Sequence, residues 1–260
     1  MALKPYFRLI RFRSWWPFLA EVALPAIIFT GGLSIPVFKL MILAYLSFNT
    51  LLYGGIYTIN DVADVESDKK HPLKKKRAIA SGEVSIASAL IFGALLIVSG
   101  FITGFLFFNA QALYLYILFF ALNLFYTFFA KHIPYLDMIG NSFSHPLRII
   151  LALVIIGYNE IPYFFISAYF FVVIGAVGIK RMVEKEVNGW EARSVLKHYP
   201  NDKLLLMQLG LLLPVLIIFY FDPSKHTLPY VTMISLYLVS VLATYFSKRI
   251  RILLKPIIAV

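Results

Sequence analysis

The feature that most constrains this chain is a series of long apolar runs. Eight stretches are long enough to cross the hydrocarbon layer of a bilayer, which is about 30 Å thick. They lie near 15–34, 37–58, 84–106, 111–129, 135–157, 161–182, 203–221 and 227–247. Because no water satisfies backbone groups inside a bilayer, such stretches cross it as α-helices. We therefore expect an all-α, polytopic bundle of eight transmembrane helices that forms a single membrane-embedded domain over residues 1–260.

The segments between these runs differ sharply in charge. All but three of the 24 Lys and Arg residues fall at the termini or in loops on one face of the expected bundle, the exceptions being Lys39, Arg148 and Lys225. Basic loops stay on the cytoplasmic side of a membrane. Both termini and the two long loops, 59–83 and 183–202, are therefore expected there. Since long charged loops usually carry function, we expect these two to cap an active site in a central cavity open to the cytoplasm.

Composition narrows the function classes. The chain is 60% apolar and 14% charged, as is typical of a multi-pass membrane protein. It has no cysteine, which excludes a disulfide framework and a thiolate catalyst. The formal net charge of +11 is explained by the cytoplasmic loops, so we expect the lipid bilayer and not nucleic acid as the partner. The sequence leaves open whether the protein forms a homo-oligomer.

Three aspartates gather where the second apolar run meets water. On a helix, Asp61, Asp64 and Asp68 fall within about 60° of one another, whereas Glu66 points away. Carboxylates on one face repel one another unless a cation lies among them. Mg²⁺ takes carboxylate oxygens on one side and substrate phosphate oxygens on the other. The pattern therefore predicts a magnesium site, the alternative being a solvated helix end.

A basic run, Lys69 to Arg77, follows the aspartates directly. One interpretation is topological, because lysines hold a loop inside and contact anionic lipid. The other is that Arg77 and one or two lysines, such as Lys75, neutralise phosphate oxygens beside the metal, since Arg makes bidentate contacts with phosphate. His71-Pro72 is expected to end the helix, and Ser81-Gly82 to form the turn into the third span.

Further polar residues lie at the ends of the fourth and fifth runs. Tyr126 and Lys131 are explained equally well by an interfacial tyrosine with a snorkelling lysine or by a site at the inner face. Asp137 and Arg148 lie on one side of the fifth run at helical spacing. An arginine this deep requires a polar partner, and we expect an aspartate or a bound phosphate.

The second long loop is basic where a second acidic motif could stand. Lys180 and Glu184 are one helical turn apart and are expected to share a face, with Arg181 beside them and Arg193 and Tyr199 in the loop that follows. Two interpretations stay open: an exposed, ion-paired helix end, or an anion-binding wall opposite the aspartates. No Asp-x-x-x-Asp pair occurs in this loop.

Taken together, these residues resemble the UbiA superfamily of intramembrane prenyltransferases over about residues 5–247. The family's first acidic motif, N-D-x-x-D-x-x-x-D, is matched in full at Asn60, Asp61, Asp64 and Asp68. The Arg-x-Ile-Ala-Ser-Gly segment after the lysines is close to the family's arginine-proline stretch, with Ala78 where proline is usual. The family's Tyr…Lys…Asp…Arg pattern on the fourth and fifth spans is matched at Tyr126, Lys131, Asp137 and Arg148. Two features depart from the family: nine spans are usual, and a second aspartate motif normally follows the sixth.

In place of that second motif, the second loop is similar to the decaprenyl-phosphate phosphoribosyltransferase branch, although the usual C-terminal segment of that branch is absent. The resemblance implies transfer of the phosphoribosyl group from phosphoribosyl pyrophosphate to a polyprenyl phosphate, with release of diphosphate. It implies Mg²⁺ as the cofactor, held by Asp61, Asp64 and Asp68. Lys131 and Arg148 would join these aspartates in catalysis. Substrate contacts are expected from Asn60, Lys75, Arg77, Tyr126, Asp137, Lys180, Arg181, Glu184, Arg193 and Tyr199.

Two rival functions share parts of this pattern. A UbiA-type prenyltransferase would move a prenyl group from a prenyl diphosphate to an aromatic or glycerol-type acceptor, using the same first motif. A transporter or lipid-binding protein would carry out no chemistry, but its polar residues should gather at the membrane midplane. Here they gather at one membrane face.

Overall fold

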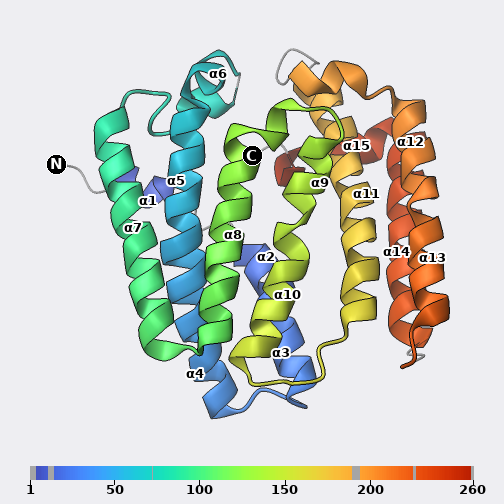
Figure 1. Cartoon of the computed structure of the whole chain (residues 1–260). Helices are drawn as coiled ribbons and strands as arrows, with labels where there is room; N and C mark the ends of the chain where they lie inside the picture. The colour runs from blue at the N-terminus through green and yellow to red at the C-terminus, as the bar shows by residue number, and fades with distance from the viewer. Residues whose placement is uncertain (1–3, 11–14, 72, 189–193, 225–226, 259–260) are drawn as a thin grey trace. The chain divides into compact units, whose positions relative to one another are not determined.

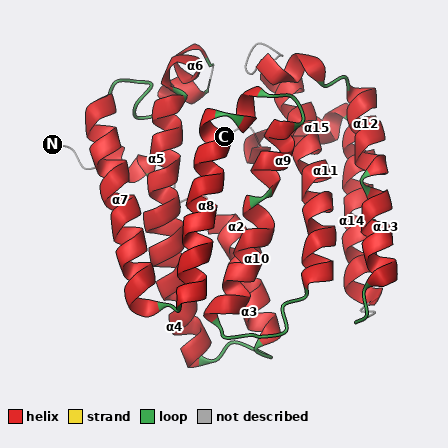
Figure 2. Cartoon of the chain, in the orientation of Figure 1, coloured by secondary structure: helices red, strands yellow, loops and turns green. Residues whose placement is uncertain are grey.

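The structure is a computed structural model that describes residues 4–10, 15–71, 73–188, 194–224 and 227–258. Within these residues every regular element is helical, as Figure 2 shows. Seven helices are long and apolar enough to cross a membrane: Ile35–Ala63, Ile86–Phe107, Ala110–His132, Leu136–Ile155, Tyr163–Glu186, Asn201–Phe221 and Thr227–Phe246. The all-α membrane fold expected from the sequence is confirmed.

Seven of the eight predicted runs coincide with these helices to within a few residues. The first, 15–34, corresponds to a shorter apolar helix, Trp16–Phe29, which is assembled from α2 (Trp15–Phe18), the π-helical segment η2 (Leu19–Ala23) and α3 (Leu24–Phe29). Gly31 and Gly32 follow with positive φ and end it. The prediction that eight helices span the membrane therefore stays a prediction.

The chain divides into two compact units. Unit 1 comprises Met1–Phe128 and Leu147–Ile161, and unit 2 comprises Phe129–Pro146 and Pro162–Val260. The single domain expected over 1–260 stays a prediction beside this division. Besides α2, η2 and α3, unit 1 holds α1 (Lys4–Leu9), α4 (Ile35–Ala44), η3 (Tyr45–Leu52), α5 (Tyr53–Ala63), α6 (Val65–Lys70), η4 (Lys74–Lys76), α7 (Ile86–Phe107), α8 (Ala110–Phe128) and most of α10 (Ser144–Ile155).

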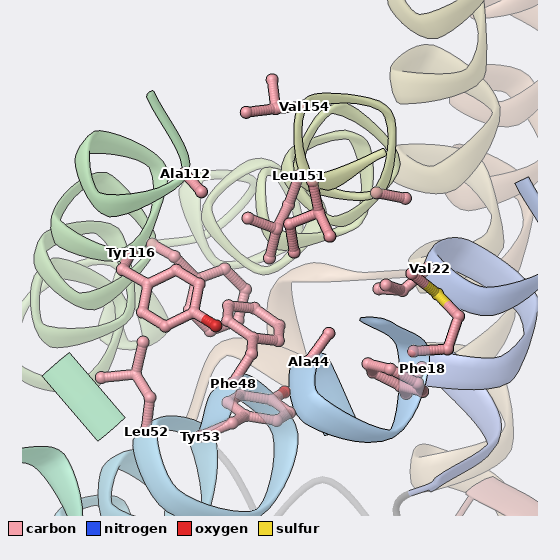
Figure 3. Packing of buried hydrophobic residues seen from close by; sticks show 14 of the residues in the cluster. Phe18, Val22, Ala44, Phe48, Leu52, Tyr53, Ala112, Tyr116, Leu151 and Val154 are labelled. Carbon is pink, nitrogen blue, oxygen red and sulfur yellow. The ribbon is translucent and has the colours of Figure 1, made fainter. Parts of the chain in front are cut away.

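Aromatic packing forms the interior of unit 1. Phe48, Tyr53 and Tyr116 are buried and contact one another or Phe119 in edge-on or tilted arrangements, and the close-up of this cluster in Figure 3 shows their rings beside Leu151. Such ring pairs stabilise a fold beyond the area that they bury.

Small residues bring α5 close to α7, and Figure 1 shows the two helices side by side. A Cβ added at Gly55 would lie 2.6 Å from the Gly93 carbonyl oxygen, and one at Gly100 would lie 2.7 Å from the Leu52 amide. Only glycine allows backbones this close, which is the usual way in which membrane helices associate. The end of α5 that carries the aspartates is therefore held on a tightly packed helix pair.

Unit 2 is organised around the long helix α11 (Tyr163–Asn188). Its other elements are η5 (Ala130–His132), α9 (Leu136–Ser142), η7 (Ser194–His198), α12 (Asn201–Gly210), α13 (Leu212–Phe221), α14 (Thr227–Phe246) and α15 (Lys248–Ile258). The loop expected at 183–202 is shorter than predicted, because α11 continues to Asn188 and α12 begins at Asn201. The helix extends past the predicted run because the next residues, Val183 and Glu184, are still buried.

Candidate active site

The aspartate motif lies on two helices and not on one. Helix α5 ends at Ala63, Asp64 adopts a bridge-region conformation, and α6 begins at Val65. The prediction of one continuous helix through Asp68 is therefore wrong, because the helix is interrupted at Asp64. The break still leaves Asp61 and Asp68 buried, while Glu66 is exposed and pairs with Lys69 at 2.7 Å. As predicted, α6 ends just before His71.

Arg77 connects the two buried aspartates. Its Nη1 donates to Asp61 Oδ1 at 3.0 Å and to Asp68 Oδ2 at 2.7 Å. Burial raises the pKa of the Asp68 carboxyl above its ordinary value, although the neighbouring Arg77 acts in the opposite direction. The two carboxylates therefore converge on the guanidinium of Arg77.

The Mg²⁺ site predicted at the aspartate motif coincides with the contact between Arg77 and the two buried aspartates. Among the described residues, no three His, Cys, Asp or Glu side chains lie close enough together to hold a metal ion. Even so, two buried carboxylates already share one cation, and carboxylate oxygens are the ligands that Mg²⁺ prefers. The two buried carboxylates therefore fit Mg²⁺ in the position that the guanidinium takes here, and Asp64 as a third ligand stays a prediction.

The loop that carries Arg77 is anchored at both ends. His71 Nδ1 accepts from the amides of Leu73 and Lys74 at 3.1 Å, and Gly82, with φ of 81°, makes the predicted turn before α7. Between them, Ala78 and Ile79 are buried in an apolar cluster with Leu9 of α1. Helix α1 therefore packs against this loop.

Ion pairs on the surface add to this anchoring. Arg8 pairs with Glu83 at 2.7 Å and also donates to the carbonyl oxygen of Lys76, next to Arg77. Lys75 is exposed, and its contact with substrate stays a prediction. The backbone on either side of Arg77 is held in place.

Other predicted residues lie near the ends of the helices. In unit 1, Asn60 is partly buried and accepts from Thr127 at 3.3 Å, one residue beyond the partly buried Tyr126. In unit 2, Lys131 is buried in η5 and Lys180 is partly buried on α11. Arg193 lies outside the described residues.

Arg148 has a partner that was not expected. Its Nη1 donates to Glu21 Oε2 at 2.8 Å, and its guanidinium lies 4.9 Å from the centre of the Tyr53 ring. The prediction of an aspartate or a phosphate is therefore corrected to a glutamate of the first apolar run. An arginine in apolar surroundings needs a counter-charge, and a lone glutamate among apolar residues was the signal in the sequence that could have identified it.

Asp137 and Arg148 lie on consecutive helices of the fifth span, and their shared face stays a prediction. The fifth span is divided between α9 and α10, so that Asp137 belongs to unit 2 and Arg148 to unit 1. Asp137 instead accepts from Arg181 Nε at 2.7 Å and from the Tyr199 hydroxyl.

Arg181 completes this second cluster. Its Nη1 donates to Glu184 at 2.7 Å, a contact that the sequence did not predict, while the shared face of Lys180 and Glu184 stays a prediction. Tyr199 also accepts from the Tyr135 amide at 2.6 Å, and its carbonyl oxygen accepts from Lys185 at 2.9 Å. Burial and the bond to Asp137 raise the pKa of Tyr199, which keeps its hydroxyl protonated. The cluster links α9, α11 and the end of η7.

Curated relatives match about half of the chain. A decaprenyl-phosphate phosphoribosyltransferase of Corynebacterium glutamicum is 33% identical over 150 residues, which is 56% of this chain and 45% of that protein. The enzyme of the same name from Mycobacterium tuberculosis is 29% identical over 144 residues, 54% of this chain and 47% of that protein. An uncharacterized protein of Sinorhizobium fredii is 34% identical over 137 residues, 52% of this chain and 26% of that protein. The chain thus spans less than half the length of these relatives.

Solved structures match almost the whole chain. A UbiA homolog from Archaeoglobus fulgidus, bound to GPP and Mg²⁺, has a TM-score of 0.72 at 18% identity and covers 98% of this chain and 95% of its own. An apo UbiA homolog from Aeropyrum pernix has a TM-score of 0.64 at 17% identity over 94% of this chain and 88% of its own. These likenesses support the fold. The model of the UbiA prenyltransferase family matches residues 15–253, across both units, and the chain belongs to that family.

Proposed function

We propose that this membrane protein transfers the phosphoribosyl group of phosphoribosyl pyrophosphate to a polyprenyl phosphate and releases diphosphate. It is thereby a glycosyltransferase of the pentosyl class. The proposal places the reaction at the cytoplasmic face of a cell membrane, because the aspartate motif and most basic residues share one end of the predicted spans.

One observation carries the choice of donor. At the end of the sixth predicted span, where the family's second aspartate motif is expected, the chain has Lys180-Arg181-x-x-Glu184. This segment has no Asp-x-x-x-Asp pair, and its Glu184 contacts Arg181 at 2.7 Å. It therefore lacks the row of carboxylates that a second metal group would require. Curated relatives named decaprenyl-phosphate phosphoribosyltransferase support the same choice.

The aspartate motif is assigned to the leaving group. Asp61, Asp64 and Asp68 would hold Mg²⁺, which when bound lowers the energy of the departing diphosphate by neutralising its charge. Arg77 and Lys75 donate to diphosphate oxygens, and the Asn60 amide, held by Thr127, orients the end of α5. The bond between C1 and the diphosphate oxygen breaks, and its electron pair leaves with the diphosphate.

The acceptor needs no general base, because its phosphate is already ionised at neutral pH. One of its oxygens attacks C1 and forms the new C1–O bond. We propose that Lys131 and Lys180 bind this phosphate or the 5-phosphate of the donor. Tyr126 is assigned to substrate binding at the same, inner face of the membrane. The isoprenoid tail is accommodated by apolar surface, such as the pocket lined by Phe18, Leu19, Ala23, Phe38, Met41, Ile42, Tyr45 and Leu46 in unit 1.

The four remaining arginine and carboxylate positions among the described residues contact other side chains of the protein. Arg148 bonds to Glu21, and Arg181 bonds to Asp137 and Glu184. Substrate contacts by Arg148, Asp137, Arg181, Glu184 and Tyr199 stay predictions. Their burial and their bonds to other side chains of the protein favour a bracing role.

A donor panel tests the proposal. Purified protein in detergent receives Mg²⁺, a polyprenyl phosphate and phosphoribosyl pyrophosphate labelled in the ribose carbons, and label is counted in the organic phase. A parallel reaction contains labelled geranyl diphosphate with an aromatic or a glycerol-type acceptor. The proposal predicts ribose label in lipid and no prenyl transfer, and the reverse result would contradict it.

The reverse result would establish the second candidate, a UbiA-type prenyltransferase. The observation that favours it is the resemblance in fold to homologs bound to GPP or DMAPP with Mg²⁺. Both candidates share the first aspartate motif and a diphosphate leaving group, so that the panel separates them by donor alone.

A further inference from the structure

We propose that Arg77 is an internal counter-cation that occupies the aspartate site in the ligand-free protein and leaves it when a divalent metal ion enters. Arg77 would then lower the affinity of the free protein for metal and become available to the diphosphate only after metal has bound. The inference rests on the metal assignment of the proposed function, but not on which donor is used.

The contact geometry motivates the first step. One nitrogen, Nη1 of Arg77, reaches both Asp61 Oδ1 and Asp68 Oδ2. The side chains of these aspartates are 5% and 3% exposed. Two buried carboxylates that face each other need a positive charge between them, because burial removes the water that would otherwise solvate them. A metal ion bound by the same two oxygens would therefore have to replace the guanidinium.

The position of Arg77 on a loop makes the exchange of its guanidinium for a metal ion feasible. The side chain is 19% exposed and belongs to a loop between η4 and α7, whereas the backbone around it is fixed by buried Ala78 and Ile79. A change of side-chain rotamer is therefore enough to release the carboxylates, and the loop does not have to unfold.

A coupling between metal and diphosphate follows. Once displaced, the guanidinium still lies on the loop beside the aspartates and presents a planar set of donors that suits phosphate oxygens. Metal binding would favour diphosphate binding in this way, and by thermodynamic linkage diphosphate would tighten metal binding by the same factor.

The test measures metal binding without turnover. Wild-type protein and the variants Arg77→Gln, Arg77→Lys and Lys76→Gln are titrated with Mn²⁺, and free Mn²⁺ is followed by electron paramagnetic resonance. Each titration is repeated with inorganic diphosphate. Lys76→Gln is the matched control. Lys76 precedes Arg77 in the chain and its side chain is exposed, so this variant removes the same charge from a neighbouring position.

We expect Arg77→Gln to bind Mn²⁺ alone about tenfold more tightly than wild type, which corresponds to removal of a competing cation worth about 1.4 kcal/mol. We expect the tightening caused by diphosphate to be lost in that variant. Lys76→Gln should behave as wild type in both titrations. Arg77→Lys keeps the charge and should lie between the two, so that the inference stays testable if Arg77→Gln does not fold.

Weaker or unchanged Mn²⁺ binding by Arg77→Gln, or an equal gain in Lys76→Gln, would overturn the inference. If neither wild type nor Arg77→Gln binds Mn²⁺, the metal site itself is wrong and the inference falls with it. If Arg77→Gln binds Mn²⁺ more tightly while the donor panel shows prenyl transfer, the inference holds and only the proposed donor fails.

Discussion

Two clusters in this protein place one arginine between two carboxylates, and they differ in how firmly that arginine is held. In unit 1, Arg77 lies on a loop, is 19% exposed and reaches Asp61 and Asp68 through a single nitrogen. In unit 2, Arg181 lies on the long helix α11, is 1% exposed and reaches Asp137 and Glu184 through two nitrogens. We propose that the same residue types therefore have different roles in the two clusters.

We propose that burial and the element that carries the arginine, more than composition, distinguish a ligand site from a structural ion pair. Asp137 has a second donor in Tyr199, so that its charge is satisfied within the protein. Asp61 and Asp68 share the partly exposed Arg77, which we propose an incoming ion replaces. Chemistry is therefore assigned to the first cluster and helix anchoring to the second.

The largest expected effect comes from the first cluster. Asp61→Asn should lower turnover by at least about 10³-fold, because a metal ligand is lost and the leaving group is less well stabilised. Initial rates of label transfer at saturating donor measure this. Glu66→Gln, on an exposed neighbour that pairs only with Lys69 among the described contacts, is the control and should stay within about twofold. More than a tenth of wild-type activity in Asp61→Asn would contradict the assignment.

The second cluster should respond in stability. Arg181→Met leaves Asp137 and Glu184 without their shared counter-charge, and we expect the free energy of unfolding to fall by about 3 kcal/mol. Denaturation in mixed micelles measures the change. Arg77→Gln is the comparison and should lose less, about 1 kcal/mol, because its surroundings are more open to water. Equal losses would remove the distinction between the two clusters.

The hydroxyl of Tyr199 tests what the second cluster does. Tyr199→Phe removes a donor to buried Asp137 and should reduce the free energy of unfolding by about 1–2 kcal/mol. A brace predicts an unchanged donor KM. A raised donor KM at unchanged stability would instead return Tyr199 to the substrate-binding residues.

The smallest effect is expected at the surface of the aspartate loop. Glu83→Gln breaks an ion pair with Arg8 in which both side chains are 42% exposed, and the change in stability should stay below about 1 kcal/mol. The anchoring then rests on buried Leu9, Ala78 and Ile79. A loss above 2 kcal/mol would show that the ion pair, and not this apolar cluster, holds the loop.

The sequence predicted the helices well, because a span of about 20 apolar residues has few alternatives in a membrane. It also identified Asp61, Asp68 and Arg77 as neighbours, since they are close along the chain. Long-range partners were out of reach. Glu21 and Arg148 are 127 positions apart, and nothing in their local patterns pairs them.

Prediction also missed how helices are interrupted. The break at Asp64 and the extension of α11 to Asn188 depend on tertiary packing, which overrides local helix preference. The contact of Arg181 with Glu184 was also not predicted, because i,i+3 and i,i+4 spacings both allow contact on a helix and the sequence does not rank them.

The central claim is that the aspartate motif holds a divalent metal ion on the diphosphate of the donor. Electron-nuclear hyperfine spectroscopy of Mn²⁺ bound to the wild-type protein with phosphoribosyl pyrophosphate tests it most directly. The account predicts ³¹P couplings from directly coordinated phosphate that are lost in Asp61→Asn. Bound Mn²⁺ without ³¹P coupling in the wild type, or the same couplings in Asp61→Asn, would contradict it.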